Sequence, residues 1–176
     1  SFGAAGNLYT TSKISSELLI KNYRLLFGQN FTILRYSTAY GPRSREVDAV
    51  SIFVERALKN LDIVIFGDGQ QKRNYLHVED LAKGSMMALK QKTKNKIITL
   101  ASKNNIKMFD LARTIVRLTK SNSKIRFNKK NKRFDDFTSN YSYKNNNEGI
   151  INWKPKYSLK KGLEQYIGFK RKLLRI

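Results

Sequence analysis

The stretch FTILRYSTAYGPR, from Phe31 to Arg43, joins a short apolar and β-branched run to a glycine-proline step. The run Phe31–Tyr36 predicts a buried strand. The segment after it, STAYGPRSR, is predicted to be a loop because it contains the Gly-Pro step. A helix is predicted before this strand, because apolar residues from Leu8 to Leu26 recur every three or four positions and Gly28 can end the helix. A helix that leads into a buried strand is the first indication of an α/β fold.

The same alternation continues towards the C-terminus. Further helices are predicted over residues 49–61, 79–89, 108–119 and 158–174, and further strands over residues 62–66 and 96–101 and at KIRF, residues 124–127. The residues from 121 to 147 show no clear period, so a long loop with that one short strand is expected there. Strands that alternate with helices predict α/β architecture with parallel strands.

Composition limits the class of protein. The chain has 176 residues, enough for one domain with its own core, and its 40% hydrophobic and 27% charged residues are typical of a globular protein. No apolar run approaches the roughly 20 residues of a membrane helix, and the N-terminus has no secretion signal. Cysteine is absent, which excludes disulfides, thiolate nucleophiles and cysteine metal sites. We expect a cytoplasmic protein without membrane contact and, since the first residue is not Met, one that begins partway through a longer chain.

The charge is strongly basic, with 35 Lys and Arg against 13 Asp and Glu and a net charge of +22. Such a balance suggests an anionic partner, either nucleic acid or a phosphorylated small molecule. Codon bias is the other explanation, because Lys, Asn and Ile are all abundant. The surplus is spread over several segments and is not gathered beside the aromatic platform that single-stranded nucleic acid needs. Nucleic acid is therefore the weaker alternative.

A candidate acid/base pair lies in the segment NLYTTSK, where Tyr9 and Lys13 are four residues apart. Residues i and i+4 share a face of a helix, so the ammonium can lie beside the phenol. A phenol titrates near pH ~10, so it is a poor base at neutral pH. Its pKa would have to fall by about three units, which requires ~4 kcal/mol of preferential stabilisation of the phenolate. A neighbouring cation supplies part of this. On spacing alone, a solvated Tyr–Lys pair on a helix surface is the better explanation.

Four segments in order resemble a known family. They are YTTSK (residues 9–13), LRYSTAYGPR (34–43), IFGDGQQKRNYLHVEDLA (65–82) and INWKPKYSLKKGLEQYI (151–167). Together they resemble the NAD-dependent epimerase/dehydratase family of the extended short-chain dehydrogenases/reductases, of which UDP-glucose 4-epimerase is the familiar member. The G-x-x-G-x-x-G turn that opens the family's Rossmann fold is absent, as is the Ser/Thr upstream of the Tyr. The chain therefore resembles the C-terminal portion of such an enzyme.

The resemblance implies a fold and a domain organisation. It implies the C-terminal part of a Rossmann-type parallel sheet together with a smaller α/β substrate-binding subdomain. The Rossmann-derived elements would cover about residues 7–40 and 74–101, interleaved with the subdomain at about 41–73 and 102–176. It also implies a homodimer formed through the helix that carries Tyr9 and Lys13.

The resemblance also implies a reaction. Tyr9 would be the acid/base that moves a proton of a sugar hydroxyl, and Lys13 would hold the cofactor ribose, while hydride passes transiently to NAD (or NADP). The substrate would be a nucleotide sugar, and LRY at the strand end favours an epimerase or a related reductase over a 4,6-dehydratase. The alternative, from another class, is a catalytically inactive module that binds nucleotide sugars or pairs with a separate N-terminal chain.

Further site residues follow from the same resemblance. Tyr36 would lie near the nicotinamide, and Ser37 and Thr38 near the sugar, although many relatives carry Asn at the position of Thr38. Arg73 would bind the diphosphate, with a surface ion pair as the alternative. Two further residues match an R-x-x-D pattern and would contact the phosphate and the ribose or base, namely Arg133 and Asp136.

The only histidine, His77, is a tempting general base. Its place between the strand-like YLHV and the following helix favours a structural role instead. No metal is expected, because one His, no Cys and scattered carboxylates make no ligand set.

Overall fold

The computed structural model describes residues 8–103, 105–129 and 150–176. The helices are α1 (Leu8–Phe27), α2 (Ala49–Leu58), α3 (Val78–Met87), α4 (Met108–Thr119) and α5 (Leu159–Leu174), with a short 3-10 turn at Gln91–Thr93. The strands are β1 (Thr32–Tyr36), β2 (Thr38–Tyr40), β3 (Ile63–Phe66), β4 (Lys72–His77), β5 (Lys96–Leu100), β6 (Asn105–Lys107) and β7 (Ile125–Asn128).

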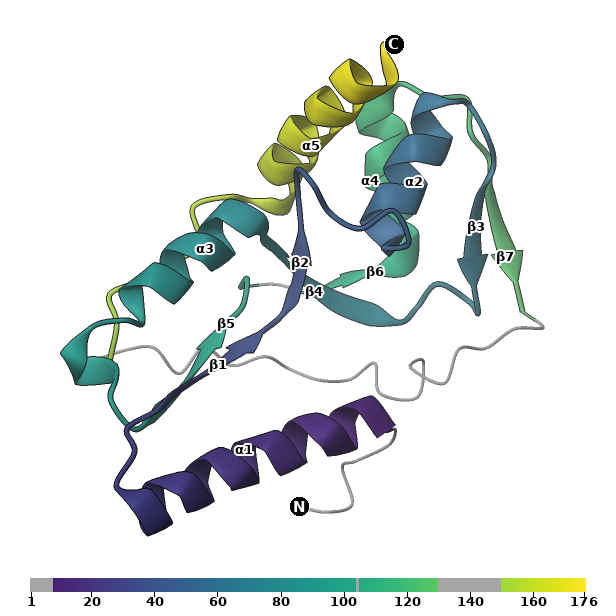
Figure 1. Cartoon of the computed structure of the whole chain (residues 1–176). Coiled ribbons are helices and arrows are strands. Elements are labelled where there is room, and N and C mark those ends of the chain that lie inside the picture. Colours follow the sequence, from purple (N-terminus) through teal and green to yellow (C-terminus); the bar gives the residue numbers. More distant parts are fainter. Residues whose placement is uncertain (1–7, 104, 130–149) are drawn as a thin grey trace.

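The predicted α/β class with parallel strands is confirmed. β1 pairs with β5, β2 with β4, and β3 with β7, all in parallel, while β4 and β6 are antiparallel. Parallel neighbours need long crossover connections, and the helices between the strands provide them (Figure 1). The short strand predicted at KIRF is β7, and the helix predicted at 108–119 has the bounds of α4.

The structure corrects three predictions about elements. STAYGPRSR was expected to be a loop, but its first residues form β2, because β4 offers a parallel edge in register with Thr38. The strand β6 was not predicted. The helix expected over 49–61 ends at Leu58, because Asn60 takes a left-handed backbone conformation with φ 53°.

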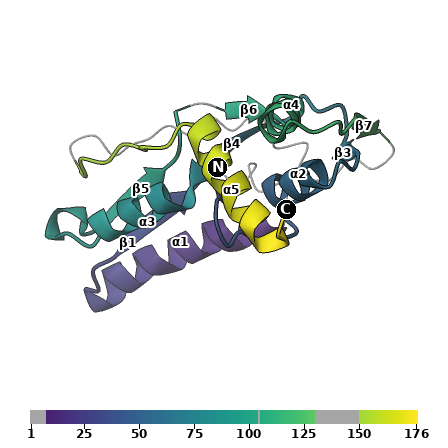
Figure 2. The same ribbon diagram turned by 90° about the horizontal axis from the view of Figure 1, so that it is seen from above.

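Two hydrophobic clusters lie on either side of β4. The larger is formed by α2, α4 and α5 packed over β3, and the smaller lies between α3, β5 and the segment before α5 (Figures 1 and 2). Successive residues of β4 contribute to different clusters, since Tyr75 belongs to the first and Leu76 to the second. Side chains alternate between the two faces of a strand, so β4 contributes to both hydrophobic clusters and joins them.

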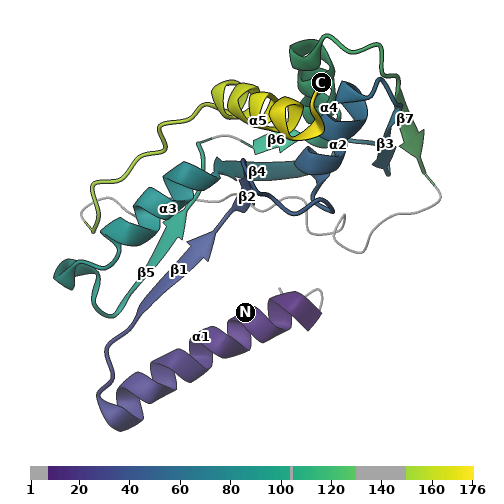
Figure 3. The ribbon, with the colours of Figure 1, turned by 45° about the horizontal axis from the view of Figure 1, so that its top comes forward.

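Helix α1 lies alongside this body rather than within it (Figures 1 and 3). None of its 20 residues is buried. The strand pair β1–β5 separates α1 from α3 in these views, and within the described residues β1 is paired with β5 alone. No helix in this part of the chain combines the length and hydrophobicity that a membrane crossing requires.

Candidate active site

The first turns of α1 bring the predicted acid/base pair together. The Nζ atom of Lys13 lies 5.4 Å from the centroid of the Tyr9 ring, as the i, i+4 spacing requires. Tyr9 is 71% exposed, so its side chain lies on the surface of the described part of the chain. The helical geometry of this pair is what the sequence predicted, while its catalytic role stays a prediction.

The same face of α1 continues to a residue that the sequence predictions did not include. Glu17, four residues after Lys13, accepts two hydrogen bonds from Arg35 near the end of β1, with Nε–Oε1 2.7 Å and Nη2–Oε2 2.6 Å. The spacing of four residues between Lys13 and Glu17 could have indicated that Glu17 lies on the same helix face. No local pattern links it to Arg35, because the two residues are 18 positions apart and lie in different elements.

The chain changes strand partner at Ser37. Its backbone N–H donates to Leu100 of β5 at 3.0 Å, and the next residue, Thr38, is already in register with Tyr75 of β4. The Ser37 side chain is 4% exposed, and its hydroxyl has no hydrogen-bond partner within the described residues. A buried hydroxyl without a partner is uncommon in folded proteins, and the sugar contact of Ser37 stays a prediction.

The two neighbours of Ser37 differ from it. Tyr36 points to the α3 side of the strand pair, where its hydroxyl lies 3.0 Å from that of Ser85. Thr38 is exposed. The structure thus gathers Ser37 and Thr38 at one strand end but directs the Tyr36 side chain towards α3, on the opposite side of the strand pair from α1.

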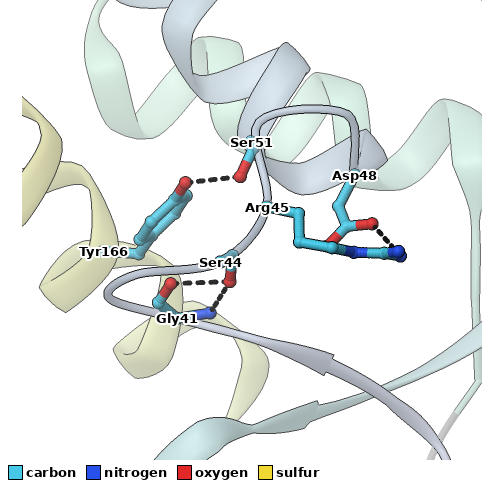
Figure 4. Close-up of polar contacts among 6 residues, drawn as sticks. All are labelled: Gly41, Ser44, Arg45, Asp48, Ser51 and Tyr166. Atoms are coloured by element: carbon cyan, nitrogen blue, oxygen red, sulfur yellow. Dashed lines mark hydrogen bonds and ion pairs between the residues drawn. The ribbon is translucent and has the colours of Figure 1, made fainter.

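The loop after β2 is held by a glycine turn, which Figure 4 shows. Ser44 both accepts from the Gly41 N–H at 2.9 Å and donates to the Gly41 carbonyl at 2.7 Å. Gly41 has φ 141°, and a Cβ atom there would lie 2.8 Å from the side chain of Val78. Only glycine fits this position without strain. The turn presents an exposed guanidinium, that of Arg45, which Asp48 binds at 2.8 Å (Figure 4).

His77 has the structural role that was expected. It is the N-cap of α3, where its Nδ1 accepts from the Glu79 N–H at 3.4 Å, and its ring stacks on Tyr157 with centroids 4.1 Å apart. Burial lowers the pKa of His77, so the ring is neutral at physiological pH. Within the described ranges, no group of three or more His, Cys, Asp or Glu residues is arranged to hold a metal ion.

The remaining predicted residues are placed as follows. Arg73 lies on β4, where its Nη1 donates to the carbonyl of Lys72 at 3.2 Å. Arg133 and Asp136 lie outside the described residues. The diphosphate contacts assigned to these arginines stay predictions.

These observations define an α/β protein with a Rossmann-type strand pair and a Tyr–Lys pair on an exposed helix. The model of the NAD dependent epimerase/dehydratase family matches residues 1–101. The chain belongs to this family, which confirms the resemblance predicted from its four motifs.

Relatives and solved structures agree with this assignment. The chain is 42% identical over 97 residues to a putative UDP-glucose 4-epimerase of Methanocaldococcus jannaschii, covering 53% of this chain and 31% of the relative. It is 27% identical over 163 residues to the UDP-glucuronate 4-epimerase of Thermodesulfobacterium geofontis, covering 93% of this chain and 50% of the relative. The crystal structure of UDP-glucose 4-epimerase from Thermotoga maritima with UDP-glucose superposes with a TM-score of 0.88 at 26% identity, covering 94% of this chain and 54% of that one. The chain thus spans about a third to a half of the length of these proteins.

Proposed function

We propose that this chain is part of an NAD-dependent enzyme that acts on a nucleotide sugar, as an epimerase or dehydratase. The observation that carries the proposal is the position of the Lys13 ammonium, 5.4 Å from the ring of Tyr9 on an exposed helix face. Support comes from the similarity to UDP-sugar 4-epimerases, at 27% identity to the UDP-glucuronate enzyme and 26% to the UDP-glucose enzyme.

The residues fit one part of an NAD site. Lys13 can donate to ribose hydroxyls from the same face of α1 as Tyr9. The Gly-rich turn that would hold the pyrophosphate is not in the sequence. The solved UDP-glucuronic acid 4-epimerase of Bacillus cereus, with a TM-score of 0.76 at 26% identity, is a complex with NAD, and we extend NAD to this chain on that basis.

The chain's own residues would then perform the proton transfer. When bound, NAD supplies a reversible hydride acceptor. Tyr9 takes the proton of the sugar hydroxyl whose carbon is oxidised and returns it when that carbon is reduced. Lys13 lies beside the same ring, with Nζ 5.4 Å from its centroid, where it would hold the cofactor next to this phenol.

Substrate binding forms part of the same proposal. Ser37 and Thr38 would contact the sugar, with Arg73 on the diphosphate and the pair Arg133 and Asp136 on the phosphate and ribose or base. Tyr36 would contact the cofactor. We further propose a cytoplasmic homodimer formed through α1, since ten large hydrophobic side chains of this helix are exposed. The proposed Rossmann-derived and substrate-binding parts correspond to residues 7–40 and 74–101, and to 41–73 and 102–176.

A second candidate is a binding module without catalysis. It is favoured by the missing Gly-rich turn, because a chain without this turn lacks the family's means of holding a dinucleotide. Calorimetric titration with UDP-glucose and with NAD separates the two candidates. Binding of the sugar nucleotide without NAD binding supports the module, or a half-enzyme that needs a separate N-terminal chain.

The test of the enzyme is the change Tyr9→Phe. We expect kcat for UDP-sugar interconversion to fall by about 100- to 10,000-fold, because the acid/base group is lost, while sugar-nucleotide affinity changes little. Turnover is measured with NAD supplied, with the chain alone and mixed with the N-terminal half of the Thermodesulfobacterium geofontis relative.

The matched control is Tyr23→Phe, the same change on the same helix at a residue that is 58% exposed. This variant should keep the activity of the unmodified chain. Equal activity in Tyr9→Phe and Tyr23→Phe would contradict the role proposed for Tyr9.

A further inference from the structure

Within the described residues, α1 is held by hydrogen bonds at two places along its length. Its 20 residues include no buried one, and its length is about 30 Å. At its C-terminal end Arg24 donates to Gly28 at 2.5 Å and to Asn30 at 3.0 Å, both in the connection to β1. Tyr9 and Lys13 lie at the opposite end. A helix held only at its C-terminal end would swing most where these two residues are.

The ion pair of Glu17 and Arg35 supplies a second attachment nearer to that end. Its two hydrogen bonds, at 2.7 and 2.6 Å, join the fork of the guanidinium to both carboxylate oxygens. A bidentate pair fixes orientation as well as distance. The single contact of Lys160 and Glu164 at 3.9 Å imposes no comparable geometry.

The pair joins the two elements that carry the proposed site. Glu17 is one turn beyond Lys13 and about 12 Å along the helix from Tyr9. On β1, side chains alternate between faces, so Arg35 shares the face of Ile33 while Tyr36 turns to α3, as its contact with Ser85 shows. Arg35 also stands two residues before Ser37. The pair therefore links the face of α1 that carries Tyr9 and Lys13 to the end of β1, where the chain passes at Ser37 from pairing with β5 to pairing with β4.

Both partners are charged at neutral pH. The hydrogen bonds from Arg35 lower the pKa of Glu17, against the opposing effect of burial, and the hydrogen bonds to Glu17 raise that of Arg35. The side chains are 54% and 21% exposed for Arg35 and Glu17. Partly exposed pairs contribute little to overall stability, so orientation of the helix is the larger consequence.

We propose that Glu17 and Arg35 are a positioning pair, which fixes α1 against the end of β1 and so sets where Tyr9 and Lys13 lie relative to Ser37. The proposal rests on the function proposed above for Tyr9 and Lys13. Neither member of the pair is assigned a contact with substrate or cofactor.

The position of the helix can be measured directly. The chain has no cysteine, so the double variant Ser15→Cys, Lys83→Cys places one spin label on α1 and one on α3, both at exposed residues. Pulsed EPR then gives the distribution of distances between the labels. We expect Arg35→Met to widen or shift this distribution, and the charge swap Glu17→Arg with Arg35→Glu to restore it.

The matched control is Arg126→Met. Arg126 forms an exposed ion pair of similar length with Asp62, at 2.9 Å, between β7 and the residue before β3. Its loss should leave the label distances unchanged. Unchanged distances in Arg35→Met, or a charge swap that behaves like the single variants, would overturn the positioning pair.

Enzyme kinetics provide a second test, because the loss of a purely structural pair would leave kcat unchanged. Misplacing a catalytic group by about 1 Å can cost up to ~100-fold in rate, so Arg35→Met should lower kcat by about 10- to 100-fold with KM for the sugar nucleotide within about threefold. The charge swap should recover most of kcat. A displaced helix with an unchanged kcat would overturn the catalytic consequence of the pair. A chain that never turns over a UDP-sugar contradicts the proposed function instead, and the label distances still decide whether the pair holds the helix.

Discussion

Gly162 shows how closely α5 approaches the centre of the molecule. A Cβ atom at this position would overlap the hydroxyl of Tyr40 and lie 3.0 Å from Cδ2 of His77. That hydroxyl donates to the carbonyl of Leu159 at 3.3 Å, so it cannot move without losing a partner. Gly168, on the same helix, has no atom within 4 Å of an added Cβ.

This difference predicts opposite effects for the same substitution. Gly162→Ala should lower the free energy of unfolding by about 1–3 kcal/mol, because a methyl group is forced into a packed contact. Gly168→Ala should raise it by up to ~1 kcal/mol through higher helix propensity. Urea denaturation followed by circular dichroism measures both. A Gly162→Ala midpoint at or above that of Gly168→Ala would be inconsistent with this packing.

At the scale of residues, the sequence predicted contacts within one element and missed those between elements. Tyr9 and Lys13 were found because helical periodicity alone brings them together. Asp80, for which the sequence predicted no contact, accepts the backbone N–H groups of Lys156 and Tyr157 at 2.9 and 2.8 Å. Partners more than 70 positions away leave no local signal, since only the completed fold brings them close.

At the scale of elements, the start of α3 is tied to the segment before α5. Tyr157 stacks on His77 and donates to Glu79 at 2.7 Å, and Trp153 donates to the carbonyl of Asp80 at 3.1 Å. Further along the same helix, a Cβ atom at Gly84 would lie 2.7 Å from the side chain of Leu100 and 3.0 Å from Nε1 of Trp153. The start of α3 is therefore tied to the segment before α5 through His77, Glu79 and Asp80.

Protonation of His77 should weaken this attachment of α3. Burial lowers its pKa in the folded state, so below about pH 6.5 the unfolded chain binds a proton that the folded chain resists. The free energy of unfolding should be retained above that pH and should fall as the pH drops below about 6.5 towards 5. Denaturant titrations at several pH values measure this slope.

The control is His77→Asn, which keeps a side-chain acceptor for the Glu79 N–H but cannot titrate in this range. It should be less stable at every pH, because the stack on Tyr157 is lost, and show a flatter dependence between pH 5 and 7. Since His77 is the only histidine, an equal slope in both proteins would show that another group is responsible.

The elements that sequence analysis missed are the shortest ones. β2 and β6 have three residues each, too few for a period to be recognised. Both form because β4 offers them an edge, β2 in parallel and β6 antiparallel. Long periodic segments such as α1 and α4 were predicted because their own pattern specifies them.

At the scale of the whole molecule, charge works against the compact state. A net charge of +22 leaves most cations without an acidic partner, and like charges repel most when the chain is folded. Ion pairs such as Lys59 with Glu55, at 2.6 Å, offset only a small part of this.

Salt should therefore stabilise the protein. Raising NaCl from 50 to 500 mM shortens the screening length, and we expect Tm to rise by about 2–4 °C, which corresponds to ~1 kcal/mol for a chain of this size. The variant Lys90→Glu, Lys92→Glu, Lys94→Glu should show a smaller rise in the same thermal scans. A Tm that falls with salt would mean that attractive pairs outweigh the repulsion.

The exposed state of α1 has a consequence for ligand affinity. Most of the stability of a helix in a protein comes from packing of its amphipathic face, and α1 buries none of its residues, so we expect the arrangement of Tyr9 and Lys13 to form in only a fraction of the molecules when nothing covers the helix. The apparent dissociation constant of any ligand that needs this arrangement is raised in inverse proportion to that fraction. A molecule that packs on the exposed hydrophobic side chains of α1 would then increase the affinity for such a ligand without contacting the ligand itself.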